Sequence, residues 1–118
     1  MKVRDLSFDS LQLGLRLCDP ATRVEGTVVG VEPDGTLLVK WDGGETARPL
    51  ETTEAEVDAG IWVVGGEFTD TSWRRIQPDT LEVHGPFSSR DAARDSWRSL
   101  SSRTLDDCMR RYMVVEAA

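Results

Sequence analysis

Histidine, cysteine and tyrosine are scarce in this chain of 118 residues, which contains one His, two Cys and one Tyr. Cys18 and Cys108 stand far apart and do not form the paired spacing of a zinc site. A general base or a metal ligand needs partner side chains beside it, and no residues are spaced so that they would predict such partners for His84. The sequence therefore predicts no metal and no cofactor. It also predicts two free thiols, and a disulfide would require the two ends of the chain to meet in the fold.

Long hydrophobic runs are also missing. No apolar stretch approaches the roughly 20 residues that cross a bilayer. The first residues, MKVRDLSFDSLQ, lack the apolar centre of a signal peptide. Hydrophobic residues make up 39% of the chain and charged residues 30%, which is typical of a globular protein. We therefore expect a cytoplasmic protein with one short domain or two very small ones.

Motifs that carry catalysis are not found either. Ser88 and Ser89 follow no nucleophile-elbow pattern. Asp106 and Asp107 are adjacent, so on a regular element their side chains point in different directions. The glycine pairs in WDGG and VVGGEF come without a phosphate-loop lysine or a GxGxxG pattern. The sequence thus predicts a protein that is not an enzyme.

What the chain has is an uneven negative charge. The formal net charge is −7, and residues 1–60 carry 6 Lys and Arg against 12 Asp and Glu. Residues 61–118 carry 8 against 9. An acidic surface repels phosphate backbones and attracts basic protein surfaces. The charge therefore favours a protein partner over a nucleic acid.

The first half is composed of short strand and turn patterns. Leucines alternate in LQLGLRLC (11–18), with Leu11, Leu13, Leu15 and Leu17 on one face. Further strands are expected at 23–32, 36–41 and 45–50, separated by the turns DPAT, EPDG and DGG. Gly26 and Gly30 inside the second strand indicate bends or bulges that curl a short sheet. The pattern predicts a small antiparallel barrel over residues 1–50.

GTVVGV, PDG and LVKWDGGE in this half resemble the SH3-like barrels of the KOW and Tudor type, over residues 10–50. The resemblance implies the fold but no single function, because such barrels occur in ribosomal proteins, transcription factors, enzyme subunits and peptide readers. Residues 51–60, which are polar and acidic, are interpreted as a linker.

The second half predicts a small β-β-β-α-β domain over residues 61–118. Strands are expected at 61–68, 71–77, within 78–87 and at 111–117. Ser88 or Ser89 opens a helix that ends at residue 103, and Ser88 and Asp91 have the spacing of a capping box. Ala93, Trp97 and Leu100 form its apolar stripe. IWVVGGEFTDTSW, HGPFSSRDAARDSWR and LDDCMRRYMVVE resemble an uncharacterised proteobacterial family of small domains of unknown function.

Two surfaces are candidates for partner binding. The first is an acidic strand and turn in the first half, roughly residues 41–45 with Glu32 and Asp34 expected nearby, around one aromatic anchor. The second is an arginine stripe along the helix of the second half. The residues are Glu32, Asp34, Trp41, Asp42, Glu45, Arg90, Arg94 and Arg98. The arginines could instead pair with Asp91 and Asp95 as a solvated face.

The sequence therefore predicts a non-catalytic accessory or adaptor protein, or a small subunit. It would bind the basic surface of a larger protein through the acidic barrel face, and its second domain would dock through strand edges or the arginine-bearing helix. The alternative is a nucleic-acid-associated protein linked to the ribosome or transcription, in which the acidic barrel would contact a protein already bound there.

Overall fold

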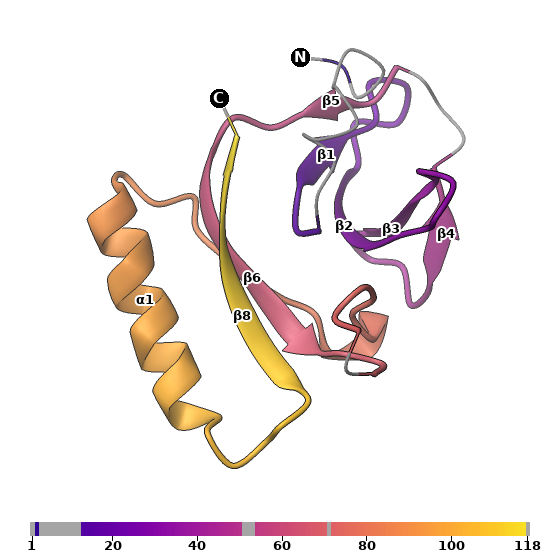
Figure 1. The fold of residues 1–118 in the computed structure, drawn as a ribbon. Helices are drawn as coiled ribbons and strands as arrows, with labels where there is room; N and C mark the ends of the chain where they lie inside the picture. The colour runs from indigo at the N-terminus through magenta and orange to yellow at the C-terminus, as the bar shows by residue number, and fades with distance from the viewer. Residues whose placement is uncertain (1, 3–12, 51–53, 71, 118) are drawn as a thin grey trace. The chain divides into compact units, whose positions relative to one another are not determined.

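The computed structural model describes residues 2, 13–50, 54–70 and 72–117, and the chain separates into two compact units, Met1–Asp58 and Ala59–Ala118 (Figure 1). Each unit contains one antiparallel sheet, and the second also contains a helix. The prediction of a mainly β fold with an α+β part is confirmed. In the described part of the chain, no helix is both long and apolar enough to cross a membrane.

The described residues of the first unit form five strands in the order β4-β3-β2-β1-β5. In chain order the strands are β1 (Arg16–Cys18), β2 (Glu25–Val31), β3 (Leu37–Trp41), β4 (Ala47–Pro49) and β5 (Glu56–Val57). Lys2 adds an isolated bridge to Glu56. Because β4 and β5 do not pair with each other, the described residues form an open sheet, whereas a closed barrel was expected.

The β2–β3 hairpin follows the glycine pattern of the sequence. Its register shifts between Val28 and Gly30, which places a bulge where glycine predicted one. Gly35 adopts a φ of 91° in the connecting turn. At the other end, a Cβ on Gly26 would lie 2.7 Å from Cε3 of Trp41. The missing side chain of Gly26 therefore makes room for the indole ring.

The first strand is shorter than expected. It begins at Arg16 because Gly14, with a φ of 86°, forms a turn with Leu13. Leu11 lies outside the described residues. At the other end of the unit, part of the interpreted linker belongs to the sheet: β5 pairs with β1, and Ala55 is completely buried.

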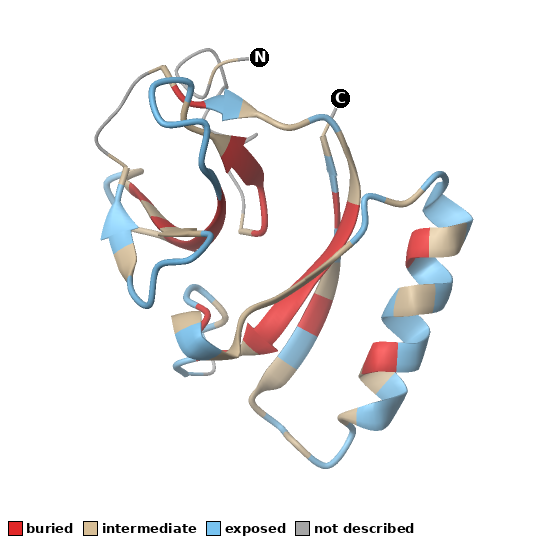
Figure 2. Cartoon of the chain, turned by 180° about the vertical axis from the view of Figure 1, so that it is seen from behind, coloured by how far each residue is buried: buried red, intermediate tan, exposed pale blue. Residues whose placement is uncertain are grey.

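The second unit has three strands in the order β7-β6-β8, with one helix packed on the sheet. Its elements are β6 (Gly60–Glu67), β7 (Glu82–His84), α1 (Arg90–Arg103) and β8 (Arg110–Ala117). Val63 and Tyr112 from the sheet pack against Ala93 and Leu100 of the helix. Along α1, the buried Ala93 and Leu100 are separated by exposed positions, as the colours of the helix show (Figure 2).

The strand expected at 71–77 is wrong. Among the described residues 72–77, the sheet contact is an isolated bridge between Phe68 and Ile76. Trp73 adopts a φ of 59°, which an extended strand does not allow. Its ring instead packs edge-on against Phe68, with 5.2 Å between ring centroids. The strand and helix order of this unit is therefore β-β-α-β.

The helix begins at Arg90 with Ser89 as its N-cap. The Ser89 Oγ accepts a hydrogen bond of 3.1 Å from the N–H of Ala92, so the capping box expected at Ser88 and Asp91 is wrong. Ala93 and Leu100 are buried as expected. Trp97 is 37% exposed, and its Nε1 donates to the carbonyl of Tyr112 at 2.8 Å. The apolar stripe thus ends at the margin of the core.

Candidate partner-binding site

One nearly buried arginine organises the acidic end of the first unit. Arg16 on β1 is 9% exposed, and its Nη1 donates to Oγ1 of the buried Thr27 at 2.6 Å. Both terminal nitrogens reach Asp42, at 3.2 and 2.9 Å. This two-pronged pairing fixes the plane of the guanidinium group. Burial alone would lower the pKa of Arg16, but the hydrogen bond and charge of Asp42 outweigh it and raise that pKa.

Two further carboxyl groups complete what we call the Arg16 cluster, defined as Arg16, Glu25, Asp42 and Asp58. Glu25 at the start of β2 lies 3.4 Å from Nη2 of Arg16. Asp58, just after β5, donates its backbone N–H to the carbonyl of Arg16 at 2.8 Å. Desolvation and a hydrogen bond with Glu25 raise the pKa of Asp58 to about 6. Asp58 therefore holds a proton more readily than an exposed aspartate.

The Arg16 cluster has an excess of negative charge, since three carboxyl groups surround one guanidinium. The side chains of Glu25 and Asp42 are 50% and 55% exposed, so a partner can reach them. Within the described residues, no group of three or more His, Cys, Asp or Glu could hold a metal ion. The arrangement is suited to accepting a positively charged side chain between Glu25 and Asp58.

The acidic residues predicted from the sequence fall into two places. Asp42 belongs to the Arg16 cluster, whereas the preceding Trp41 packs its ring against Gly26 on the opposite face of the sheet, and the exposed Glu45 follows in the next turn. Glu32 and Asp34 lie at the opposite end of the β2–β3 hairpin. Four steps along β3 at roughly 3.3 Å each separate the two ends by about 13 Å. The expectation that Glu32 and Asp34 lie near the Trp41–Glu45 turn is therefore wrong.

Sequence reasoning missed Arg16, Glu25 and Asp58 as site residues. A signal for Arg16 was present, because a charged residue between Leu15 and Leu17 must find a partner when the strand is buried. No local pattern named that partner. Asp42 and Asp58 are distant in sequence and reach Arg16 only through the strand order β3-β2-β1-β5.

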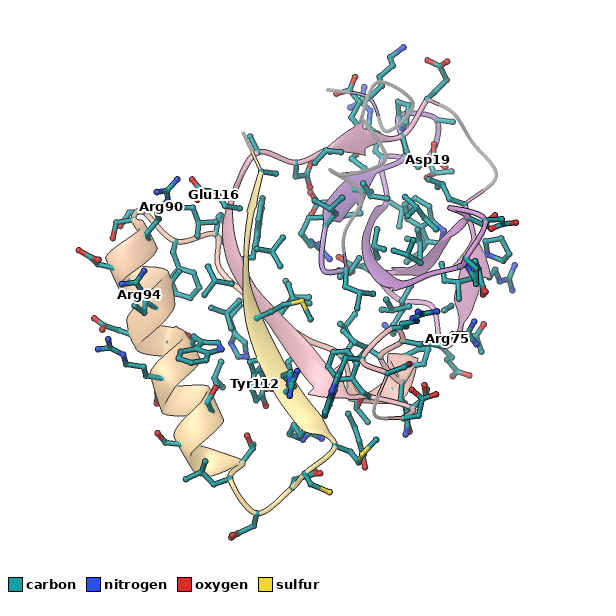
Figure 3. The ribbon with its side chains drawn as sticks, in the orientation of Figure 1. Asp19, Arg75, Arg90, Arg94, Tyr112 and Glu116 are labelled. Carbon is teal, nitrogen blue, oxygen red and sulfur yellow. The ribbon has the colours of Figure 1, made fainter. Side chains whose placement is uncertain are left out.

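Within the described part of the chain, the predicted arginine stripe divides into one paired residue and two without an ion pair. Arg90 binds Glu116 of β8 with two contacts, at 2.7 and 3.2 Å (Figure 3). Arg94 and Arg98 are exposed on α1. Among the ion pairs of the described residues, none joins these two arginines to Asp91 or Asp95. The pairing within the helix that the sequence left open is therefore not formed.

A second polar network surrounds Glu82 on β7. Its Oε2 accepts from the hydroxyl of Tyr112 at 2.5 Å and from Nη1 of Arg110 at 2.9 Å. Its Oε1 lies 3.3 Å from Nε2 of His84. Partial burial by itself would raise the pKa of Glu82, but the hydrogen bonds from Tyr112 and His84 lower it. His84, the single histidine, thus belongs to a hydrogen-bond network that links β7 to β8.

The two cysteines are free thiols. Cys18 is partly exposed, and partial desolvation together with the nearby carboxylates, Asp58 first among them, raises the pKa of its thiol. A raised thiol pKa reduces the thiolate fraction, which makes Cys18 a poor nucleophile. Cys108 is exposed.

Comparisons with known proteins address the second unit. No curated protein and no solved structure matches the chain. Residues 60–117 match the family model described as "Domain of unknown function (DUF4170)". This range covers nearly the whole second unit, Ala59–Ala118. The prediction that the C-terminal part is a small domain of unknown function is confirmed.

Proposed function

We propose that this protein is a non-catalytic accessory or adaptor protein of the bacterial cytosol, or a small subunit, whose first unit is an SH3-like module that binds a basic surface of a larger protein. The Arg16 cluster carries the proposal. Three carboxyl groups face one guanidinium, and the pKa of Asp58 is raised to about 6 by desolvation and by Glu25. A site with this charge is incomplete without a second cation.

A lysine or arginine of the partner would provide that cation. Placed between Glu25 and Asp58, it would offset the negative charge that Asp58 acquires as the pH rises through its raised pKa, and it would form charge-assisted hydrogen bonds. Trp41 is the register partner of Gly26 and therefore projects from the opposite face of the sheet to Arg16 and Thr27, which leaves the contact at the cluster to charged groups. The negative charge of residues 1–60 would increase the rate of encounter with a basic surface.

The test purifies the tagged wild type and tagged variants from the native host, with and without nuclease treatment, and compares the proteins that co-purify with each. The variants are Glu25→Gln with Asp58→Asn, and Asp34→Asn as the control. Asp34 is exposed at the far end of the hairpin. We expect one stoichiometric protein with a basic surface to co-purify with the wild type and with Asp34→Asn, and to be lost from the double variant.

Two outcomes would contradict this proposal. A partner retained equally by the double variant would place the interface elsewhere on the chain. Recovery only of nucleic-acid-bound proteins that disappear after nuclease treatment would favour the ribosome- or transcription-linked alternative.

A further inference from the structure

The outer edge of β8 displays unpaired backbone groups. The N–H of Phe68 donates to the carbonyl of Met109 at 2.9 Å, so Met109 faces β6. Alternation along an antiparallel strand then turns the backbone groups of Arg110, Tyr112, Val114 and Glu116 away from β6. The bond from Trp97 to the carbonyl of Tyr112 agrees with this alternation. β8 is therefore an edge strand of eight residues.

Only the first half of this edge is protected. The N–H of Arg110 is bonded to the carbonyl of Asp107, and Trp97 covers the carbonyl of Tyr112. In the described part of the chain, no donor or acceptor meets the outward backbone groups of Val114 and Glu116. The side chain of Val114 is 43% exposed. An edge of this kind can pair with an added strand.

Helix α1 runs alongside this edge and brings positive charge to it. Arg90 is bonded to Glu116 (Figure 3). Trp97 is bonded to the carbonyl of Tyr112, so the helix and the strand are joined at two points. Arg94 lies midway between Arg90 and Trp97 on the same side of the helix, as Val114 lies midway between Glu116 and Tyr112. Arg94 and the following Arg98 are exposed, and neither is paired with a carboxylate among the described residues.

A hollow of about 460 Å³ continues the edge beyond Trp97. It lies between the end of α1 and the start of β8, and Leu105 in its wall is 81% exposed. Trp97, Ser101, Thr104 and Tyr112 also line it, and its charged lining residues are Arg110, Arg111 and Asp107, of which Asp107 is paired with Arg110. Trp97, Leu105 and Val114 thus provide exposed apolar surface on this side of the unit.

We propose that the edge of β8 binds an extended segment of a partner protein in which apolar residues are flanked by acidic ones. The segment adds a strand at Val114 and Glu116 through its own backbone N–H and C=O groups. An apolar side chain enters the hollow beside Trp97 and Leu105. Its carboxylates pair with Arg94 and Arg98, and this charge complementarity selects an acidic segment. The site is in the second unit and does not depend on the Arg16 cluster.

The experiment titrates the full-length chain with the peptide Ac-EDVLVDE-NH2 and follows backbone amide shifts by NMR. We expect saturable shifts centred on Val114, Glu116 and the indole N–H of Trp97. Arg94→Ala and Arg98→Ala should each weaken the affinity about two- to fivefold, as for exposed ion pairs. Arg103→Ala is the matched control, because nine residues after Arg94 it faces the opposite side of α1.

Two control peptides separate the contribution of charge to binding from that of backbone pairing. Ac-KKVLVKK-NH2 has the opposite charge and should bind at least tenfold more weakly. The acidic peptide with alternate backbone nitrogens methylated cannot pair as a strand and should produce no saturable shifts. These peptide controls leave the fold of the protein unchanged.

The proposal is overturned if the acidic and basic peptides bind equally, or if the shifts centre on residues away from β8 and α1. It is also overturned if the chain alone self-associates in sedimentation velocity with the amides of Val114 and Glu116 protected from exchange. In that case a second copy of β8 occupies the edge.

Discussion

The hydroxyl of Tyr112 donates to the carboxylate of Glu82 at 2.5 Å across Gly65. Both residues are register partners of Gly65, from opposite sides of β6. A Cβ on Gly65 would lie 2.5 Å from Cδ1 of Tyr112. The missing side chain on the central strand therefore allows the two edge strands to be joined over it.

Gly65→Ala should lower the free energy of unfolding of the second unit by about 1–3 kcal/mol, because the methyl group overlaps the backbone carbonyl oxygen of Arg111, at 2.3 Å, as well as the ring of Tyr112. Urea unfolding followed by circular dichroism measures the change. Tyr112→Phe is the matched variant, since it removes the hydrogen bond without adding volume. If Gly65→Ala is as stable as the wild type, the close packing at Gly65 is not real.

Arg16→Lys should lower the free energy of unfolding of the first unit by about 1–3 kcal/mol. Lysine keeps the charge but lacks the planar fork that binds both oxygens of Asp42 while donating to Thr27. Chemical denaturation at neutral pH measures the loss. Arg48→Lys on the exposed part of β4 is the control and should have no measurable effect. Equal stability of the two variants would contradict the role of Arg16.

Asp58 should make the first unit less stable as the pH rises. Its pKa is about 6 in the folded chain, where desolvation and Glu25 disfavour the charged form, against 3.8 in the reference state. The stabilisation by the protonated carboxyl is therefore complete below pH 3.8 and is lost as the pH rises through 6.

Urea midpoints of the wild type and of Asp58→Asn, compared between pH 4 and pH 7.5, test this dependence. Asparagine cannot ionise, so the stability of the variant relative to the wild type should increase with pH across this range. A constant difference between the two proteins would show that the pKa of Asp58 is not raised in the folded state.

Ser89→Ala should destabilise the second unit by about 1 kcal/mol, since the Ser89 Oγ accepts from the N–H of Ala92 at the start of α1. Ser88→Ala removes the hydroxyl group of the preceding residue, which does not cap the helix, and should change the stability little. Thermal unfolding of the two variants in parallel decides between the two serines. A larger loss for Ser88→Ala would reverse the assignment of the N-cap.

The sequence by itself determined most of the local structure. Alternating apolar residues and the turns around Gly35 and Gly43 predicted the β2–β3–β4 meander, and the stripe of Ala93 and Leu100 predicted α1. These features depend on residues close together in the chain, so periodicity and turn chemistry reveal them. TSWRRIQ has strand propensity but does not form a strand. The ring of Trp73 packs against Phe68 and the guanidinium group of Arg111, and no local pattern reveals these contacts.

Only the tertiary structure decided which charged residues meet. Arg16 is paired with Asp42, which is 26 residues away, and Arg90 with Glu116, also 26 residues away. Neither pair is marked by local spacing, because strand order and helix placement determine it. The same is true of the free edge of β8, since which backbone groups face outward depends on its register with β6. Hydrophobic periodicity is a property of one segment, whereas an ion pair or a sheet edge is a relation between segments that folding alone brings together.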